Sequence, residues 1–287
     1  MGYAYLEKKE FALSTEAFRI YLQNNPKSKK KSADALMRIG DNYFVQAEND
    51  QAIKFYTQAL NLNSGYEDQA LYYIGKTNGY KGESHAKITN LLKLINDHPS
   101  SKYLQLAIYE IAESYLSEGQ LSKSIQYYKK IVVEYPNSLL VVESKINIAD
   151  IYYKQGDYNK AEGDYKNVLN QHGGDPKICE RAVRGLIDIY KSSSQPEKVE
   201  QLISQYECAN FSHDEKEDLY YIPAIEAYND SAFQKAIPLF DKYLDKFPNG
   251  RYSNEVKNYT ANCYYKTGDI EKAVALYRES LTGPNTG

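Results

Sequence analysis

The sequence of 287 residues repeats one pattern of small and aromatic residues at intervals of 35 to 38 positions. In the clearest copies an aromatic follows a small residue three positions later, a second small residue comes nine positions further on, and a second aromatic comes four positions after that. The clearest copies are Gly2, Tyr5, Ser14 and Phe18; Gly40, Tyr43, Ala52 and Tyr56; Ala112, Tyr115, Ser124 and Tyr128; Ala149, Tyr152, Ala161 and Tyr165; and Ala261, Tyr264, Ala273 and Tyr277. A period of this length predicts a stack of similar units, each of which needs its neighbours to bury its apolar face.

The spacing within one copy predicts two antiparallel helices joined by a short turn. Ala149 and Tyr152 share one face of a first helix, and Ala161 and Tyr165 share one face of a second, because residues three or four apart are neighbours on a helix. Gly156 lies between them, where the chain leaves the first helix with a positive φ. A proline stops the second helix at Asn25-Pro26, His98-Pro99, Tyr135-Pro136 and Phe247-Pro248. We therefore predict an all-α fold, an α-α superhelical solenoid of helical hairpins.

These units resemble the tetratricopeptide repeat, and the resemblance covers essentially the whole chain. It implies a single solenoid over residues 1–287 that binds other proteins in a concave groove. The predicted units are 2–30 (partial), 33–66, 68–101, 105–138, 142–175, 180–213 (diverged), 217–250 and 254–287. Both ends of this array look cut, so we expect that the native N-terminus is not present and that the segment belongs to a longer chain.

Two loops refine the resemblance. The sequences YPNS at 135–138 and FPNGRY at 247–252, together with a period nearer 37 than 34, resemble the repeats of bacterial envelope proteins, namely the outer-membrane assembly lipoprotein and the Tol-Pal coordinator. That resemblance implies a periplasmic or outer-membrane-associated protein. A cytoplasmic location is the alternative, since cytoplasmic arrays share such loops.

Composition and motifs argue against several other functions. The net charge of −3 and a pI near 5.9 leave no basic surplus for nucleic acid, and no stretch reaches the length of a membrane span. The four histidines form no metal-binding pair, and no phosphate-binding loop or nucleophile motif is found. We predict a protein that is not an enzyme and has no cofactor or metal, with its oligomeric state left open.

The three cysteines, Cys179, Cys208 and Cys263, form no CxxC motif. Cys179 is predicted to open the first helix of its unit, and Cys208 to end the second helix of the same unit. These two ends are neighbours in an antiparallel hairpin, so a disulfide is possible in an oxidising compartment. The alternative is that they are free thiols that pack as small hydrophobic residues.

The resemblance places partner binding at the second, fifth, ninth, twelfth and thirteenth places of each first helix. Four of the ninth places are acidic: Asp41, Glu113, Asp150 and Asp188. The aromatic residues at fifth and twelfth places are Phe44, Tyr72, Tyr109, Tyr153, Tyr221, Tyr228 and Tyr265. An acidic groove rich in tyrosine suits an extended peptide with basic or aromatic side chains. The alternative for the acids is the solvated face of an amphipathic helix.

Two prolines, Pro223 and Pro238, fall inside predicted helices of one unit and predict a local bend of the superhelix around 218–240. The function that the sequence favours is a protein-binding scaffold. The alternatives are a glycan-binding solenoid, because tyrosine faces also stack on sugar rings, or the accessory region of a larger multidomain protein.

Overall fold

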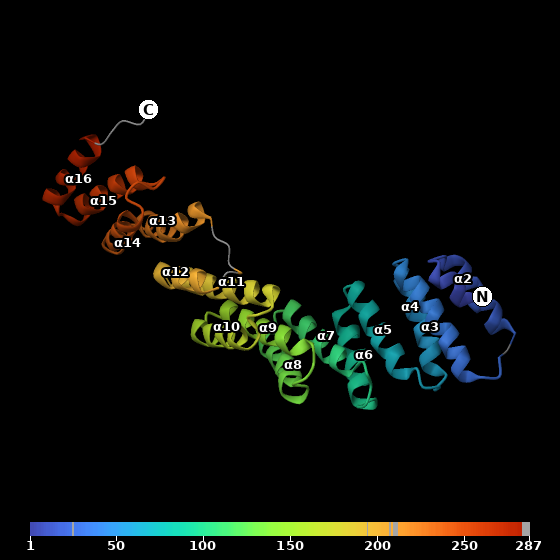
Figure 1. The fold of residues 1–287 in the computed structure, drawn as a ribbon. Helices are drawn as coiled ribbons and strands as arrows, with labels where there is room; N and C mark the ends of the chain where they lie inside the picture. The colour runs from blue at the N-terminus through green and yellow to red at the C-terminus, as the bar shows by residue number, and fades with distance from the viewer. Residues whose placement is uncertain (25, 194, 207, 209–211, 283–287) are drawn as a thin grey trace. The chain divides into compact units, whose positions relative to one another are not determined.

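The computed structural model describes residues 1–24, 26–193, 195–206, 208 and 212–282, with the backbone alone for 279–282. All sixteen elements in this part of the chain are α-helices, which confirms the predicted all-α fold (Figure 1). The chain divides into two compact units, Met1–Ile151 and Tyr152–Gly287, and each is described by itself. The single solenoid over 1–287 stays a prediction.

The N-terminal unit is a series of helices in which each of α1 to α7 packs on the next in the chain. Its helices are α1 (Gly2–Glu7), α2 (Phe11–Gln23), α3 (Lys29–Val45), α4 (Asn49–Asn61), α5 (Glu67–Tyr80), α6 (Ser84–Asp97), α7 (Leu104–Ser117), α8 (Leu121–Glu134) and α9 (Leu140–Lys154), whose last residues enter the second unit. One cluster of buried side chains joins α2 to α5, and a second joins α5 to α9. The hydrophobic core is therefore a continuous layer between hairpins.

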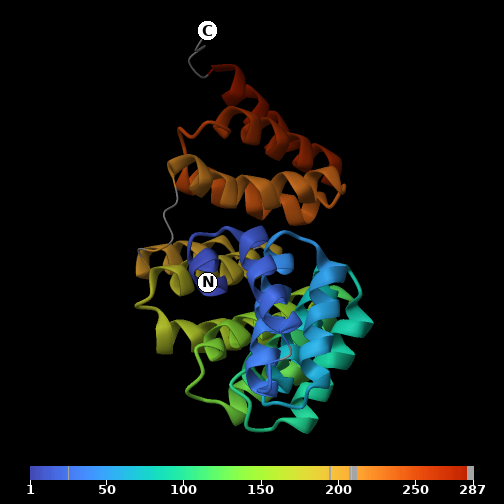
Figure 2. The same ribbon diagram turned by 90° about the vertical axis from the view of Figure 1, so that its right-hand side faces the viewer.

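The C-terminal unit continues with helices of the same kind, and Figure 2 shows two of its hairpins side by side. Its helices are α10 (Tyr158–His172), α11 (Pro176–Ser192), α12 (Pro196–Gln205), α13 (His213–Asn229), α14 (Phe233–Lys246), α15 (Ser253–Thr267) and α16 (Ile270–Thr282). In both units hairpin turns and helix ends lie where the glycine and proline positions of the sequence predict them. Gly156 has a φ of +76°, and α6, α8 and α14 end just before their Pro-containing loops. The Asn25-Pro26 stop falls partly outside the described residues.

A close helix crossing explains the small residue at the start of each pattern. In the hairpin of α3 and α4, a Cβ added at Gly40 would lie 2.5 Å from the ring of Tyr56, which is fully buried. Gly2 has the same relation to Phe18, at 2.8 Å. The first helix thus approaches the second closely enough for one ring to cover its backbone, and a large side chain at the small position cannot fit there.

Both prolines in the predicted repeat 217–250 lie inside continuous helices, Pro223 in α13 and Pro238 in α14. Neither proline interrupts its helix or delays its start. The predicted bend of the superhelix around 218–240 stays a prediction.

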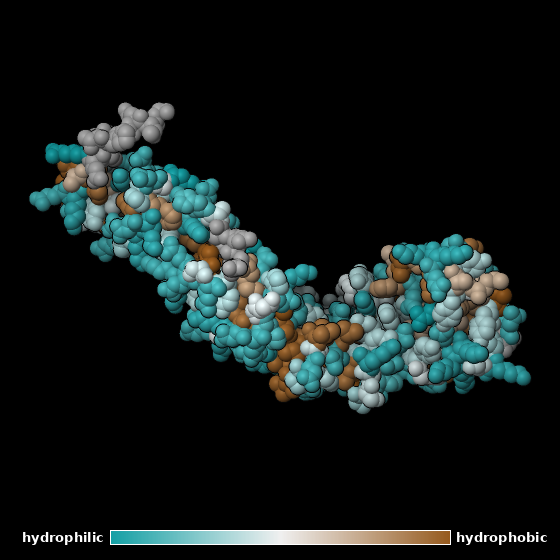
Figure 3. Space-filling model, viewed as in Figure 1, coloured by the Kyte–Doolittle hydropathy of each residue, from teal (hydrophilic) through white to brown (hydrophobic). Residues whose placement is uncertain are grey.

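The chemical character of the surface is mixed. Figure 3 shows a face that is mostly hydrophilic, with a hydrophobic area over α7 and α8, where Leu106 and Val133 are exposed. Among the described helices, none is long and apolar enough to cross a lipid bilayer.

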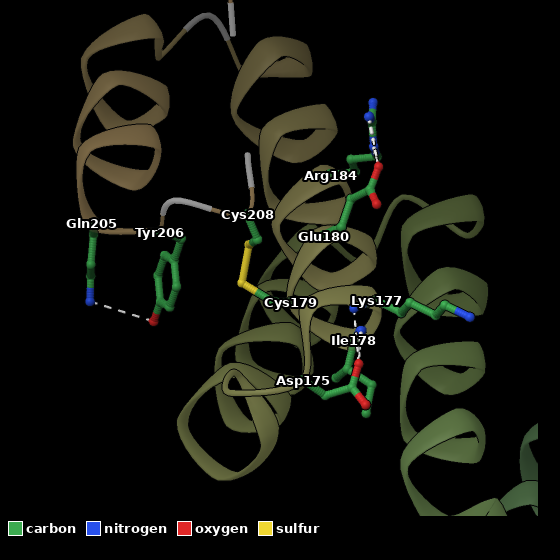
Figure 4. Close-up of a disulfide and its surroundings, with 9 residues drawn as sticks. All are labelled: Asp175, Lys177, Ile178, Cys179, Glu180, Arg184, Gln205, Tyr206 and Cys208. Atoms are coloured by element: carbon green, nitrogen blue, oxygen red, sulfur yellow. Dashed lines mark hydrogen bonds and ion pairs between the residues drawn. A yellow bond between two sulfur atoms is a disulfide. The ribbon is translucent and has the colours of Figure 1, made fainter. Parts of the chain in front are cut away.

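A disulfide joins Cys179, near the start of α11, to Cys208, which follows α12 (Figure 4). The two Cα atoms are 6.1 Å apart, and the bond spans 29 residues of sequence. The position predicted for Cys208 was wrong, because α12 ends at Gln205 and the cysteine lies in the connection to α13. Cys263 is a free, buried thiol, and burial raises its pKa to about 11.

Replacing Gly185 with Ala tests close packing between α10 and α11. The added Cβ would lie 2.3 Å from the buried ring of Tyr165, so we expect a loss of about 1–3 kcal/mol in the free energy of unfolding, measured by urea denaturation. Gly163 in α10 is the control, since a Cβ there meets nothing within 4 Å. Gly163→Ala should gain about 1 kcal/mol from helix propensity. Equal effects of the two substitutions would contradict the close packing.

Thiol titration tests the disulfide. Denatured protein prepared without reductant should show a single reactive thiol, Cys263, and three after reduction. Cys179→Ser should lower the free energy of unfolding by about 3–4 kcal/mol, because the bond closes a loop of about 30 residues. Three free thiols before reduction would contradict the bond.

Candidate partner-binding site

The acids at the ninth place of two first helices are tied to the tyrosines that cover the hairpin crossings. The Tyr56 hydroxyl donates to Asp41 at 2.9 Å, and the Tyr128 hydroxyl donates to Glu113 in the same way, each across 15 residues of sequence. Asp41 also pairs with Arg38 at 2.5 Å. Burial raises the pKa of Asp41 above its usual range, although Arg38 and Tyr56 act in the opposite direction.

Burial and the neighbouring carboxylates raise the pKa of Tyr56 and of Tyr128 far above the usual range for tyrosine. Both hydroxyls therefore stay protonated and remain donors. These two acids are not freely solvated, because each accepts a hydrogen bond that links the second helix of its hairpin to the first. A role for them in binding stays a prediction, as it does for Asp150, which is half-buried, and for Asp188, which is exposed.

The tyrosines at the fifth place connect one helical hairpin to the next. Tyr72 is only 6% exposed and stacks on Tyr103, with ring centroids 5.0 Å apart. Tyr221 stacks in the same way on Tyr252, at 3.8 Å. Burial, with a smaller contribution from the Glu110 carboxylate, raises the pKa of Tyr72 to about 12. Tyr72 therefore offers little surface to a partner, whereas Tyr221 is half-buried.

Asn147 makes the corresponding connection at Tyr109. Its side-chain amide is buried and donates to the Tyr109 hydroxyl at 3.1 Å, to the Tyr128 hydroxyl at 3.0 Å and to Glu113 at 3.1 Å. Asn147 comes from the first helix of the following unit, so this network fixes the register between two hairpins.

The aromatic residues at the twelfth place are more accessible. Tyr265 is 56% exposed near the end of α15, and Phe44, Tyr153 and Tyr228 are half-buried near the ends of α3, α9 and α13. Tyr153 lies 3.3 Å from the hydroxyl of Ser192, and Asn262 donates to the Tyr228 hydroxyl at 2.6 Å. Their hydroxyls are thus held in place while part of each ring faces solvent.

Sequence reasoning missed several tyrosines. Tyr80, at a thirteenth place, is 66% exposed and packs edge-on against Phe44. Tyr66, Tyr103 and Tyr252 each stand at the cap of a first helix. The Tyr66 and Tyr252 hydroxyls donate to Asp34 and Asp218 of the preceding first helix. The 37-residue spacing of Tyr66 and Tyr103 was the available signal.

We call the accessible aromatic residues Tyr153, Tyr228 and Tyr265 of the C-terminal unit the twelfth-place row. Phe44 and Tyr80 are accessible aromatic residues of the N-terminal unit. Within the described ranges, no group of three or more His, Cys, Asp or Glu side chains is arranged to hold a metal ion.

Sequence comparisons agree with this architecture. Family models described as the tetratricopeptide repeat match residues 33–66, 106–138, 141–170 and 224–286, which together make up more than half of the chain. The chain is therefore a tetratricopeptide repeat protein. A search of curated protein sequences found no match.

Solved structures show the same fold. A tetratricopeptide repeat protein from Parabacteroides merdae is 16% identical over 90% of this chain and 95% of its own, with a TM-score of 0.55. The C-terminal part of a repeat protein from Cytophaga hutchinsonii is 16% identical over 100% of this chain and 95% of its own, with a TM-score of 0.54. BtubC from P. vanneervenii is 14% identical over 70% of this chain and 89% of its own, with a TM-score of 0.55. At these identities the likeness shows the fold alone.

Replacing Tyr128 with Phe tests the hairpin network. It removes the hydroxyl that Glu113 and Asn147 both contact, so we expect a loss of about 1–3 kcal/mol in the free energy of unfolding, measured by chemical denaturation. Tyr127→Phe on the same helix is the control, because its ring packs against Tyr115, and it should change stability by less than about 0.5 kcal/mol. Equal changes in the free energy of unfolding for the two variants would contradict a stabilising role of the Tyr128 hydroxyl.

Proposed function

We propose that this protein is a non-enzymatic scaffold whose twelfth-place row binds an extended segment of a partner protein. The observation that carries the proposal is the difference in exposure among the aromatic residues of the first helices. At the fifth place Tyr72 is buried under Tyr103, whereas Tyr265, at the twelfth place of α15, is 56% exposed.

Exposed, positioned tyrosines suit protein recognition for a physical reason. A tyrosine ring buries a large area on binding and loses few rotamers, and its hydroxyl accepts or donates a hydrogen bond at the edge. The tetratricopeptide repeat fold supports protein binding as the general function. The partner segment is expected to carry basic or aromatic side chains, which complement tyrosine rings and the nearby carboxylates.

We further propose that the protein acts in an oxidising compartment, as part of a bacterial cell-envelope complex. The disulfide between Cys179 and Cys208 supports this location, because structural disulfides persist in secreted and periplasmic proteins and are rare in reducing cytosol. The sequences YPNS and FPNGRY, which resemble loops of envelope repeat proteins, support it from the sequence.

A double substitution tests the row. Tyr153→Ala with Tyr265→Ala removes one half-buried and one exposed ring from first helices, so partner recovered in quantitative pull-downs from the source cells should fall at least about tenfold. Circular dichroism should show unchanged helicity. Val274→Ala, exposed on the second helix α16, is the control and should recover the partner as wild type does. Undiminished recovery by the double variant would contradict the assignment.

A further inference from the structure

A hollow of about 240 Å³ in the N-terminal unit lies where three successive helices meet. Its lining residues are Lys76, Gly79 and Tyr80 of α5, Lys87 of α6 and Glu110 of α7. A volume below about 300 Å³ is small for a drug-sized molecule or a large cofactor. The hollow therefore suits one small group, and the charges of its walls decide which kind.

Lys87 departs from the repeating pattern at a position that is small and buried in other hairpins. Ala52, Ser124 and Ala161 stand at the corresponding places, and each of them is fully buried. The Lys87 side chain is largely buried as well, with 13% of its surface exposed. A lysine in such a place needs room for its stem and a partner for its charge, because an unpaired buried charge is costly.

Gly79 supplies the space for the Lys87 side chain. It stands at a twelfth place, where Phe44 of the preceding hairpin carries a ring. A Cβ added at Gly79 would lie 2.9 Å from Cδ of Lys87 and 3.5 Å from its Nζ atom. The stem of Lys87 thus crosses from α6 over the backbone of α5, and its ammonium lies directly above Gly79. A glycine and a lysine together put a cation where another hairpin has an aromatic ring.

The charged groups of the hollow add up to a positive charge. Nζ of Lys87 pairs with the Glu110 carboxylate at 2.5 Å, and an ammonium has three N–H donors, so others are left for a ligand. Lys76, which is half-buried, adds a second cation at a ninth place. The neighbouring hairpins have the acids Asp41 and Glu113 at that place. Two ammonium groups beside one carboxylate favour an anion over a cation.

Tyr80 provides an apolar wall beside these cations. Its ring is 66% exposed and packs edge-on against Phe44, with ring centroids 5.4 Å apart. An exposed ring that is already packed along one edge can stack on a flat apolar group at little cost in rotamer freedom. The hollow thus offers an aromatic ring and two ammonium groups to the same ligand.

We infer that this hollow binds a small organic oxyanion, a carboxylate or a phosphate carried on a flat apolar group. The oxyanion accepts hydrogen bonds from the ammonium groups of Lys76 and Lys87, and the flat group packs on Tyr80. Glu110 competes with the ligand for Lys87 and holds its ammonium in place when no ligand is bound. The site goes beyond the proposed function, because it uses none of the residues of the twelfth-place row.

Binding of two anionic probes to the full chain tests the site. Benzoate and phenyl phosphate distinguish a carboxylate from a phosphate ligand, and benzamide, which is uncharged and close to benzoate in shape, is the control probe. Titrations followed by the backbone amide NMR signals of Gly79 and Tyr80 should show at least one anion binding roughly tenfold tighter than benzamide. Equal affinity for benzamide and both anions, or no shift of these signals with either anion, would overturn the inference.

Charge variants test the role of each group. Lys76→Gln and Lys87→Met should each weaken binding of the anion roughly tenfold, and Lys87→Met keeps an apolar stem over Gly79. Glu110→Gln should instead tighten binding roughly threefold to tenfold, since it removes the carboxylate that competes for Lys87. Lys54→Gln, exposed on α4, is the matched control and should bind as wild type does.

The opposite signs of these effects distinguish a site from a general effect of charge. Circular dichroism checks that each variant keeps its helicity, and Lys76→Gln with Glu110→Gln decides the question where Lys87→Met fails to fold. A loss in Lys54→Gln equal to that in Lys76→Gln, or unchanged binding in both Lys76→Gln and Glu110→Gln, would overturn the inference. The tyrosine double variant of the twelfth-place row should bind the anion as wild type does, so the proposed function is tested separately.

Discussion

The close crossing of the two helices in each hairpin is the contact on which the rest of the structure depends. It demands a small residue, such as Gly40, directly beneath a large ring, such as Tyr56. The same ring carries a hydroxyl that reaches Asp41 on the first helix, so one tyrosine both fills the crossing and fixes an acid at the ninth place. Glu113 and Tyr128 repeat the arrangement, and Asn147 extends it to the next hairpin. The tyrosine of the crossing thus fills the space between the helices and also hydrogen-bonds a partly buried carboxylate.

This arrangement determines what is left for function. Some side chains at fifth and ninth places are committed to neighbours, as Tyr72 is to Tyr103 and Glu113 is to Tyr128. Tyr265 at a twelfth place and Tyr80 at a thirteenth keep most of their surface exposed, whereas the twelfth-place Tyr228 packs on Tyr259. We therefore propose that a partner contacts the exposed rings near the ends of first helices.

The sequence was sufficient for the fold because the small and aromatic positions recur with a fixed period, and because Gly156 and the Pro-containing loops mark the helix ends. It was not sufficient to separate structural tyrosines from accessible ones. Tyr72 and Tyr153 are both tyrosines of first helices that the sequence assigned to the binding face, and the exposure of such a ring depends on the residue that covers it, for example Tyr103 over Tyr72. The disulfide could be proposed from the hairpin geometry but not decided, since oxidation depends on the compartment, and the end of α12 at Gln205 was misplaced because that unit keeps little of the pattern.

The central claim, that a partner contacts the ends of the first helices, is tested most directly by site-specific photo-crosslinking. A benzophenone amino acid placed at Tyr265 on α15, or at Val274 on the neighbouring α16, samples a first and a second helix of the same hairpin. The account predicts a crosslinked partner from position 265 and none from position 274. A partner crosslinked from 274 but not from 265 would contradict it.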